Sequence, residues 1–216
     1  MDIKQAIIDR LRATKRENIE AVINFMEKHN FFSVECGHHH EYKGGMASHA
    51  WQTYQIALRL YAENQASNPK APKYSEDSIA ICALLHDICD CSGMEYIHGH
   101  GLRSVEMLRE LGFHLSDDEY LAIRYHMSIS RHKGEALYED GLRNQLRYLI
   151  HSSDGKSAKL RKGYADPKVP QQKSQEKDKF ISKYIEALGI IGINVVNDSG
   201  DNMDAEELYA YLKNNC

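Results

Sequence analysis

The chain has 216 residues, of which 42% are hydrophobic and 27% are charged, and its formal net charge is −4. These values are typical of a soluble globular protein that is long enough to bury a large core. The acidic balance argues against general nucleic-acid binding, which needs a concentrated basic surface.

The sequence also lacks the usual signals for export or membrane insertion. Its N-terminal stretch is amphipathic and has no continuous apolar segment of the signal-peptide kind. No apolar run reaches the roughly 18 residues that a membrane span requires. The five cysteines are odd in number and form no disulfide framework, as expected in a reducing compartment. We therefore expect a cytoplasmic protein without membrane association.

Apolar periodicity predicts a mostly helical chain that begins with two short amphipathic helices. Their apolar faces consist of Ile3, Ile7, Ile8 and Leu11 in the first, and of Ile19, Val22, Ile23 and Met26 in the second. Two copies of the chain could pair through these helices, so the sequence leaves open whether the protein forms a homo-oligomer. A longer helix is predicted over residues 46–65, and it carries His49.

Capping signals predict the helices that follow. Ser75 is the expected N-cap of a helix that runs to about Asp90. Residues 99–110 form another helix, and Ser116 with Glu119 has capping-box spacing for a helix that reaches about His126. A last helix of the main domain runs through Asp154 toward Leu160, along an apolar stripe of Leu142, Leu146, Leu149 and Ile150.

Composition changes after residue 160. Residues 161–178 are polar, charged and contain two prolines, which is typical of a flexible loop or linker. Residues 179–216 are expected to add helices that pack on the main domain of residues 1–160, and 193–196 are the best strand candidate. The predicted fold is therefore an all-α helical bundle with a C-terminal helical extension.

The strongest functional signal is the pair His86–Asp87 inside the apolar run ALLHDICD. Burying an imidazole and a carboxylate among leucines is costly unless they are paired or bound to a metal ion. A hydrogen-bonded structural pair is the alternative to a metal site. Further candidate ligands favour the metal: His49 upstream, and His100, His126 and Asp154 downstream.

Several of these assignments have close competitors in the sequence. His98 stands near His100, His132 near His126, and His151 near Asp154. The triplet at positions 38–40 lies in a glycine-flanked polar loop, which favours solvated surface, although it could also cover a pocket. The number of ions, one or two, stays open at this point.

The ordered series H…HD…D resembles the HD superfamily of metal-dependent phosphohydrolases over residues 40–160. The resemblance implies an HD-domain-like helical bundle and maps the four ligands of a mononuclear site onto His49, His86, Asp87 and Asp154. The two additional histidines of binuclear members map onto His100 and His126. Asp87 would then bridge two ions.

The chain departs from the common family pattern HDIGK, because it reads HDICD and carries Asp90 where lysine usually stands. Some nucleotidase-like members have an acid there, which makes Asp90 a candidate general acid or base. The GYP signature of the cyclic-dinucleotide branch is absent after His126. Arg103 and Lys156 are the preferred phosphate contacts because each lies near a proposed ligand in the sequence.

Together these features predict a metal-dependent phosphohydrolase that acts on a small phosphorylated molecule, and a nucleotide is the favoured substrate class. The site residues would be Asp87, Asp90, Arg103 and Lys156 for catalysis, with one or two divalent ions of Mn, Fe, Co, Ni or Zn as cofactors. The alternatives are an HD-type di-iron oxygenase and a non-catalytic metal- or nucleotide-binding sensor module.

Overall fold

The computed structural model describes residues 2–36, 39–92, 99–127 and 129–160. Contacts divide the chain into two units, residues 1–165 and residues 166–216, and the described residues all belong to the first. The predicted linker over 161–178, the C-terminal helices of 179–216 and the strand candidate lie outside the described residues. The domain boundaries therefore stay predictions.

The described residues form an all-α bundle, as predicted. The first five α-helices are α1 (Ile3–Ala13), α2 (Ile19–Lys28), α3 (Gly45–Ser67), α4 (Glu76–Leu85) and α5 (His100–Glu110). They are followed by α6 (Asp117–Arg124), α7 (Tyr138–Arg143) and α8 (Gln145–Leu160), with short 3₁₀ helices η1 (Ile88–Ser92) and η2 (Ile129–His132) between them. No helix in the described part of the chain has both the length and the apolar character needed to cross a bilayer.

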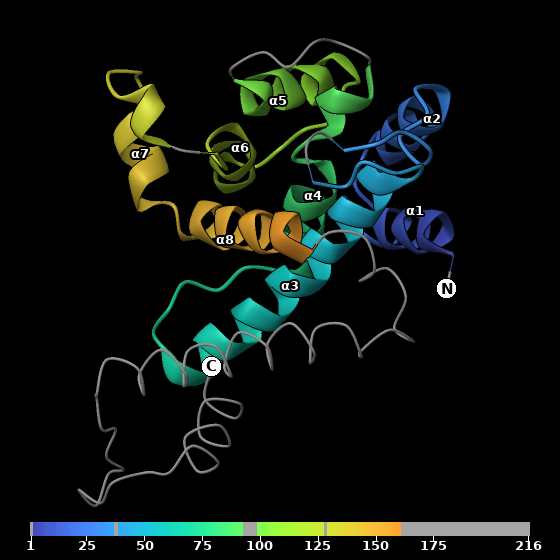
Figure 1. The fold of residues 1–216 in the computed structure, drawn as a ribbon. Coiled ribbons are helices and arrows are strands. Elements are labelled where there is room, and N and C mark those ends of the chain that lie inside the picture. The colour runs from blue at the N-terminus through green and yellow to red at the C-terminus, as the bar shows by residue number, and fades with distance from the viewer. Residues whose placement is uncertain (1, 37–38, 93–98, 128, 161–216) are drawn as a thin grey trace, which may run out of the picture. The chain divides into compact units, whose positions relative to one another are not determined.

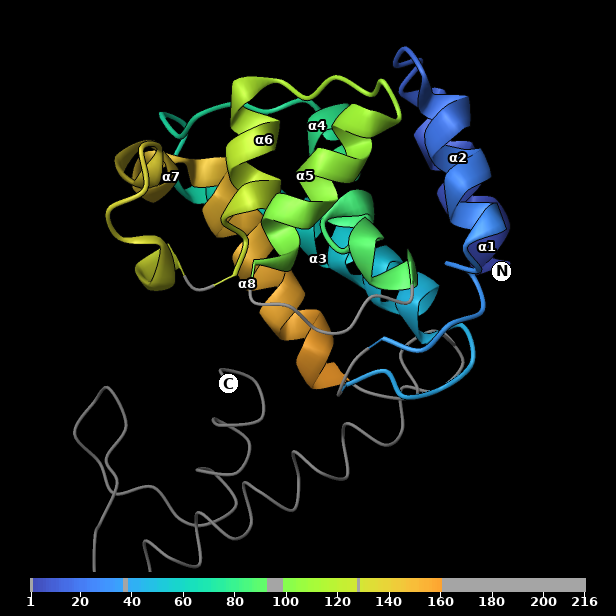
Figure 2. The same ribbon diagram turned by 90° about the horizontal axis from the view of Figure 1, so that it is seen from above.

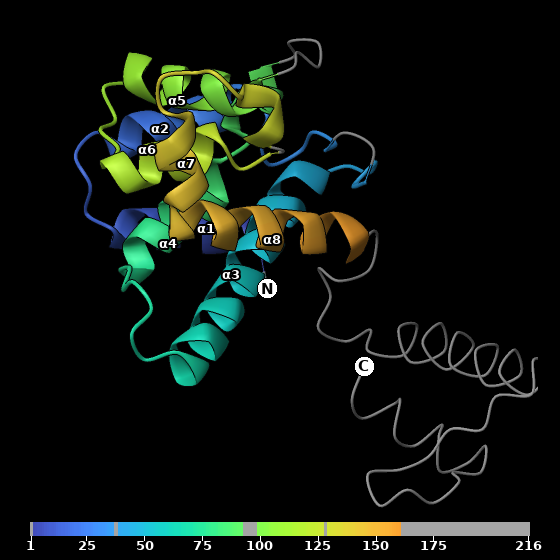
Figure 3. The same cartoon turned by 90° about the vertical axis from the view of Figure 1, so that its left-hand side faces the viewer.

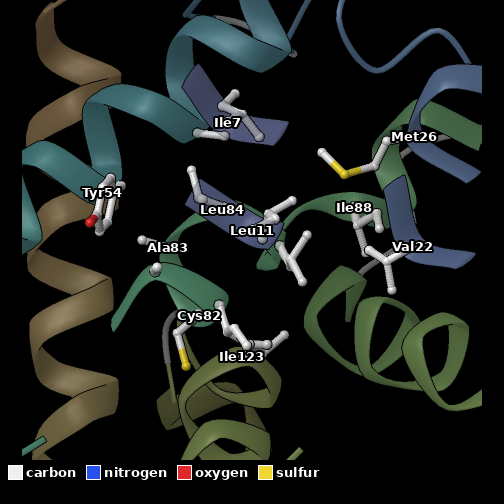
Figure 4. Packing of buried hydrophobic residues seen from close by; sticks show 14 of the residues in the cluster. Ile7, Leu11, Val22, Met26, Tyr54, Cys82, Ala83, Leu84, Ile88 and Ile123 are labelled. Carbon is white, nitrogen blue, oxygen red and sulfur yellow. The ribbon is translucent and has the colours of Figure 1, made fainter. Parts of the chain in front are cut away.

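The helices pack around α4, whose apolar segment is buried on all sides. Every residue from Ile79 to Leu85 is at most 1% exposed. Figure 4 shows Leu84 of α4 next to Leu11 of α1, and Cys82 of α4 facing Ile123 of α6. An all-round apolar helix is stable only at the centre of a bundle, so the continuous apolar run of residues 79–85 explains the central position of α4.

The other helices surround α4 in pairs. The long helix α3 packs most extensively on α8 and next on α4 (Figure 1). Helices α5 and α6 lie side by side when the bundle is viewed from above (Figure 2). The short helix α7 lies against α6 and η2 at the outside of the bundle (Figure 3). This arrangement directs the inner faces of α3, α4, α6 and α8 toward one region.

Local capping explains where the helices begin. Ser75 accepts a hydrogen bond from the Ser78 amide, at 3.0 Å, and so caps α4 as predicted. Ser116 and Glu119 form the predicted reciprocal capping box at the start of α6. Each cap satisfies backbone amides that have no partner within the helix.

Two predicted helices were wrong in detail. The helix from Ser75 does not continue to Asp90, because α4 ends at Leu85 and the chain resumes as the 3₁₀ helix η1. The last helix does not include Leu142, because Asn144 adopts an extended backbone conformation and separates α7 from α8. In both places the apolar stripe continues across the break, so periodicity alone did not reveal it.

The cysteines within the bundle are buried free thiols, as expected for Cys82 and Cys89. Cys36 and Cys91 are buried and free as well. Cys216 lies outside the described residues.

The contact between α5 and α6 depends on a glycine. A Cβ atom at Gly101 would lie 2.6 Å from the carbonyl oxygens of both Ile123 and Arg124, which belong to the backbone of α6. We expect Gly101→Ala to destabilise the protein by about 1–3 kcal/mol, the usual cost of overpacking, and thermal denaturation would measure it.

Gly155 of α8 provides the matched control, because no atom lies within 4 Å of a Cβ added there. Gly155→Ala should raise the melting temperature slightly, since alanine is favoured over glycine inside a helix by about 0.5–1 kcal/mol. Equal melting temperatures for the two variants would contradict the proposed close contact of α5 with α6.

Candidate metal centre

Six predicted side chains meet at the inner ends of the helices, and we call His49, His86, Asp87, His100, His126 and Asp154 the His/Asp cluster. They come from separate elements: His49 from α3, His86 and Asp87 from the end of α4, and His100 from the start of α5. His126 follows α6, and Asp154 lies in α8. The fold thus brings together residues that are up to 105 positions apart in the sequence.

Asp87 lies at the centre of the cluster, and its two carboxylate oxygens face different pairs of histidines. Its Oδ2 lies 3.2 Å from His86 Nε2 and 3.7 Å from His49 Nε2. Its Oδ1 lies 3.3 Å from the Nε2 atoms of both His100 and His126. The carboxylate therefore joins two groups of nitrogen donors.

Asp154 completes the first of these groups. Its Oδ1 lies 3.2 Å from His49 Nε2 and 3.9 Å from His86 Nε2. Within each group the imidazoles face each other directly: the Nε2 atoms of His49 and His86 are 3.3 Å apart, and those of His100 and His126 are 2.9 Å apart. Ligands that share one ion at bond lengths of about 2 Å lie roughly 3 Å apart, so these spacings suit coordination.

The other ring nitrogens explain why Nε2 is the atom available to a cation. His86 donates from Nδ1 to the carbonyl of Ala83 at 3.0 Å, and His126 donates from Nδ1 to the carbonyl of Ile123 at 2.7 Å. A carbonyl oxygen only accepts, so in each neutral ring the proton is on Nδ1 and the lone pair is on Nε2. Such hydrogen bonds to the far nitrogen are the usual support of metal-binding histidines.

An unsatisfied oxygen also fits a cation. Asp87 Oδ1 is buried and makes no hydrogen bond of good geometry to any described residue, although two imidazole nitrogens lie near it. An unpaired carboxylate oxygen in a low-dielectric site is costly, and a divalent ion would compensate it. The donor set contains only imidazole and carboxylate groups, which suits Mn, Fe, Co, Ni or Zn.

Charges within the cluster are strongly coupled. Burial disfavours a charge on His86, but the carboxylates of Asp87 and Asp154 outweigh burial and raise the pKa of His86 to about 9. Burial opposes ionisation of Asp154, but His49 and His86 outweigh it and lower its pKa to about 2. Asp87 is likewise held ionised against burial, because His86, His100 and His126 lower its pKa. Without a bound metal, the two ionised carboxylates therefore hold a proton on His86, and a divalent ion that binds at His86 Nε2 displaces this proton.

Asp90 occupies a different position, at the edge of the His/Asp cluster. It lies in η1, and its amide donates to the carbonyl of Asp87 at 3.0 Å, so the two side chains project on the same side of the 3₁₀ turn. Burial, and then the negative charge of Asp87, raise the pKa of Asp90. Its carboxyl group is thus more easily protonated than an ordinary aspartate.

The two predicted phosphate contacts, Arg103 and Lys156, stay predictions, and the structure gives each of them other neighbours. The guanidinium of Arg103 approaches Glu106 and Glu110 of its own helix, at 3.7 and 3.8 Å. Lys156 is exposed and lines a surface pocket with Tyr61 and Tyr148, two positions along α8 from Asp154. Residues two apart on a helix point in opposite directions, and none of the contacts described for Arg103 or Lys156 reaches the His/Asp cluster.

The competitors of the predicted ligands have other partners. His132 approaches Glu135, with Nδ1 2.7 Å from the carboxylate. His151 donates from Nδ1 to the carbonyl of His126 at 2.6 Å. His98 lies outside the described residues.

The prediction that the histidine triplet is solvated surface was wrong for two of its members, and His38 lies outside the described residues. His40 is fully buried and His39 is half-buried. His40 Nε2 lies 3.0 Å from Gln52 Oε1, and Ser157 Oγ lies 3.2 Å from the same oxygen. Burial lowers the pKa of both His39 and His40, so both rings are neutral near pH 7.

Gln52 and Ser157 were missed by the sequence analysis, although a signal for them exists. Each stands three residues after a predicted ligand on the same helix face, Gln52 after His49 and Ser157 after Asp154. Ser157 Oγ lies 3.0 Å from His49 Nδ1, and it is the polar support of that imidazole.

Comparison with known families gives one match. The model of the family described as HD domain matches residues 46–165, which is more than half of the chain and includes all six residues of the His/Asp cluster. No curated protein and no solved structure matches the chain.

Metal content tests the central position of Asp87. We expect Asp87→Ala to lose bound divalent ions, because it removes the carboxylate whose two oxygens lie within 3.7 Å of all four imidazoles of the cluster. Elemental analysis of the purified protein, with circular dichroism to verify folding, would measure this loss.

Asp90→Asn is the control for this experiment, because Asp90 is a neighbouring carboxylate outside the His/Asp cluster. It should keep the metal content of the unmodified protein. A folded Asp87→Ala variant with undiminished metal would show that the cluster does not hold the ion.

Proposed function

The chain belongs to the HD domain family of the metal-dependent phosphohydrolase superfamily, and on this premise we propose that it hydrolyses a phosphoester of a small molecule, a nucleotide. Four imidazoles and two carboxylates would hold one or two divalent ions. The substrate class is supported by the acidic residue Asp90 in the family motif, which resembles nucleotidase-like members.

One observation carries the proposal most directly: the two oxygens of Asp87 each face a separate pair of imidazoles. His49, His86 and Asp154 with Oδ2 would form one ligand group, and His100 and His126 with Oδ1 would form the other. A bridging carboxylate of this kind suits two ions that act on the same phosphoryl group. When bound, divalent ions lower the pKa of a coordinated water molecule and compensate the negative charge of the phosphoryl group.

The chain's own residues would orient and protonate the reactants. Asp90 lies beside Asp87 on the same side of η1, and its raised pKa favours a carboxyl group that can give and take a proton. We propose that Asp90 passes a proton between water and the leaving oxygen. The carbonyls of Ala83 and Ile123 hold His86 and His126 in fixed orientations during this exchange.

The assignment of Arg103 and Lys156 as phosphate contacts stays a prediction. Arg103 approaches glutamates of its own helix, and Lys156 lies with the surface pocket of α3 and α8.

A phosphate-release screen tests the proposal. The purified protein would be analysed for bound elements and then assayed with nucleoside mono-, di- and triphosphates and with other phosphoesters, each with added Mn, Fe, Co, Ni or Zn. We expect release of inorganic phosphate that depends on the divalent ion.

The alternatives give different outcomes in the same screen. Bound iron with oxygen uptake and no phosphate release would favour a di-iron oxygenase. Tight nucleotide binding without any product would favour a sensor module. Either result would contradict the proposed hydrolase activity.

The role of Asp90 makes a kinetic prediction. Asp90→Asn should lower kcat by about 10²–10⁴-fold, the usual contribution of a general acid or base, while metal content stays unchanged. Steady-state kinetics of phosphate release would measure this change, and a variant with undiminished kcat would remove Asp90 from the mechanism.

A further inference from the structure

His39 lies beside the His/Asp cluster but is not one of its six members. It comes from the loop that precedes α3, and the centroid of its ring is 4.6 Å from that of His49. One ring nitrogen of His39, one of His49 and the Cys36 sulfur all lie within 4.8 Å of one another. His39 is therefore close enough to the cluster to share a cation with His49.

A chain of hydrogen bonds determines which nitrogen of His39 carries the proton. The amide oxygen of Gln52 only accepts, so His40 donates to it from Nε2, at 3.0 Å. The remaining nitrogen of neutral His40, Nδ1, must then accept, and His39 donates to it from Nδ1 at 2.8 Å. This leaves the lone pair of neutral His39 on Nε2. Among the described residues, no hydrogen bond occupies that atom.

The same amide oxygen acts on His49 from the other side. The Ser157 hydroxyl donates to Gln52 Oε1, at 3.2 Å, or to the His49 carbonyl, at 3.3 Å, and in either case it accepts from His49 Nδ1, at 3.0 Å. His49 therefore also keeps its lone pair on Nε2, the atom that faces Asp87 and Asp154. Two hydrogen-bond chains that include Gln52 Oε1 thus leave the lone pairs of neutral His39 and His49 on their Nε2 atoms.

Resting on the proposed function, we infer that His39 Nε2 is a further ligand of the divalent ion held by His49, His86, Asp87 and Asp154. His40 and Gln52 act as positioning residues, because they fix the tautomer of His39 without reaching the ion.

The position of His39 distinguishes it from the six cluster residues. Those residues lie in helices or directly at helix ends, whereas His39 lies in a loop whose backbone is joined by the bridge between Cys36 and His40. A neutral imidazole adds a nitrogen donor without adding charge, so it strengthens the site without repelling the substrate's phosphate.

Cobalt binding tests this inference with readouts other than activity. The full-length protein would be titrated with Co²⁺ against a competing chelator, and the visible absorption spectrum, which depends on coordination number and ligands, would be recorded. We expect His39→Ala to bind Co²⁺ about 10–100-fold more weakly at the cluster and to show an altered spectrum. Added free imidazole should restore the spectrum by entering the space that the side chain leaves.

Controls separate this effect from misfolding and from failure of the whole site. His114→Ala removes an exposed imidazole and should bind Co²⁺ like the unmodified protein. His39→Asn keeps a polar side chain and serves as a second variant in case His39→Ala folds poorly. It should bind Co²⁺ as weakly as His39→Ala. Gln52→Leu should weaken binding as well, because the chain of hydrogen bonds loses its acceptor.

Two outcomes would overturn the inference, and they are distinguishable. If the unmodified protein binds Co²⁺ and both His39 variants keep its affinity and spectrum, His39 is not a ligand although the proposed function stands. If the unmodified protein binds no divalent ion, the proposed function fails together with the inference.

Discussion

The structure depends on the burial of one carboxylate among imidazoles. Asp87 is 9% exposed, and its oxygens lie 3.2 to 3.7 Å from four histidine nitrogens. An isolated carboxylate at such a depth would strongly destabilise the protein. The polar groups around Asp87 are therefore needed for folding as well as for binding an ion. The helices that carry these groups must therefore keep their relative positions, and the apolar core around α4 provides that rigidity.

The sequence singled out part of the His/Asp cluster because these residues interrupt an apolar helical pattern. His49, His86 and Asp154 stand among residues that periodicity places inside, where a polar side chain needs a specific partner. The family resemblance then supplied the order of the series and the two histidines His100 and His126. The capping box at Ser116 was equally predictable, since it depends on residues three positions apart.

The remaining features depend on tertiary structure. The end of α4 at Leu85 and the break at Asn144 do not interrupt the apolar stripes, so no local pattern marked them. His39 and His40 were assigned to solvent because their loop is polar and flanked by glycines. His40 instead contacts Gln52 of α3, and His39 packs beside His49, and no sequence period connects this loop to α3. The roles of Arg103 and Lys156 stay predictions, because they were inferred from proximity to a candidate ligand along the chain and depend on a substrate that the structure does not contain.

The ends of the helices have a further electrostatic consequence. His86 is the C-cap of α4, and His126 follows Tyr125, the C-cap of α6. The ring centroids of the two histidines lie 4.9 Å apart, so the carboxyl ends of two helices converge on the cluster. The aligned peptide dipoles give such an end a partial negative charge, which favours cations and disfavours anions. The two carboxyl ends therefore add to the charges of Asp87 and Asp154 in favouring a cation, while the amino end of α5 at His100 brings a partial positive charge to the Oδ1 side of Asp87.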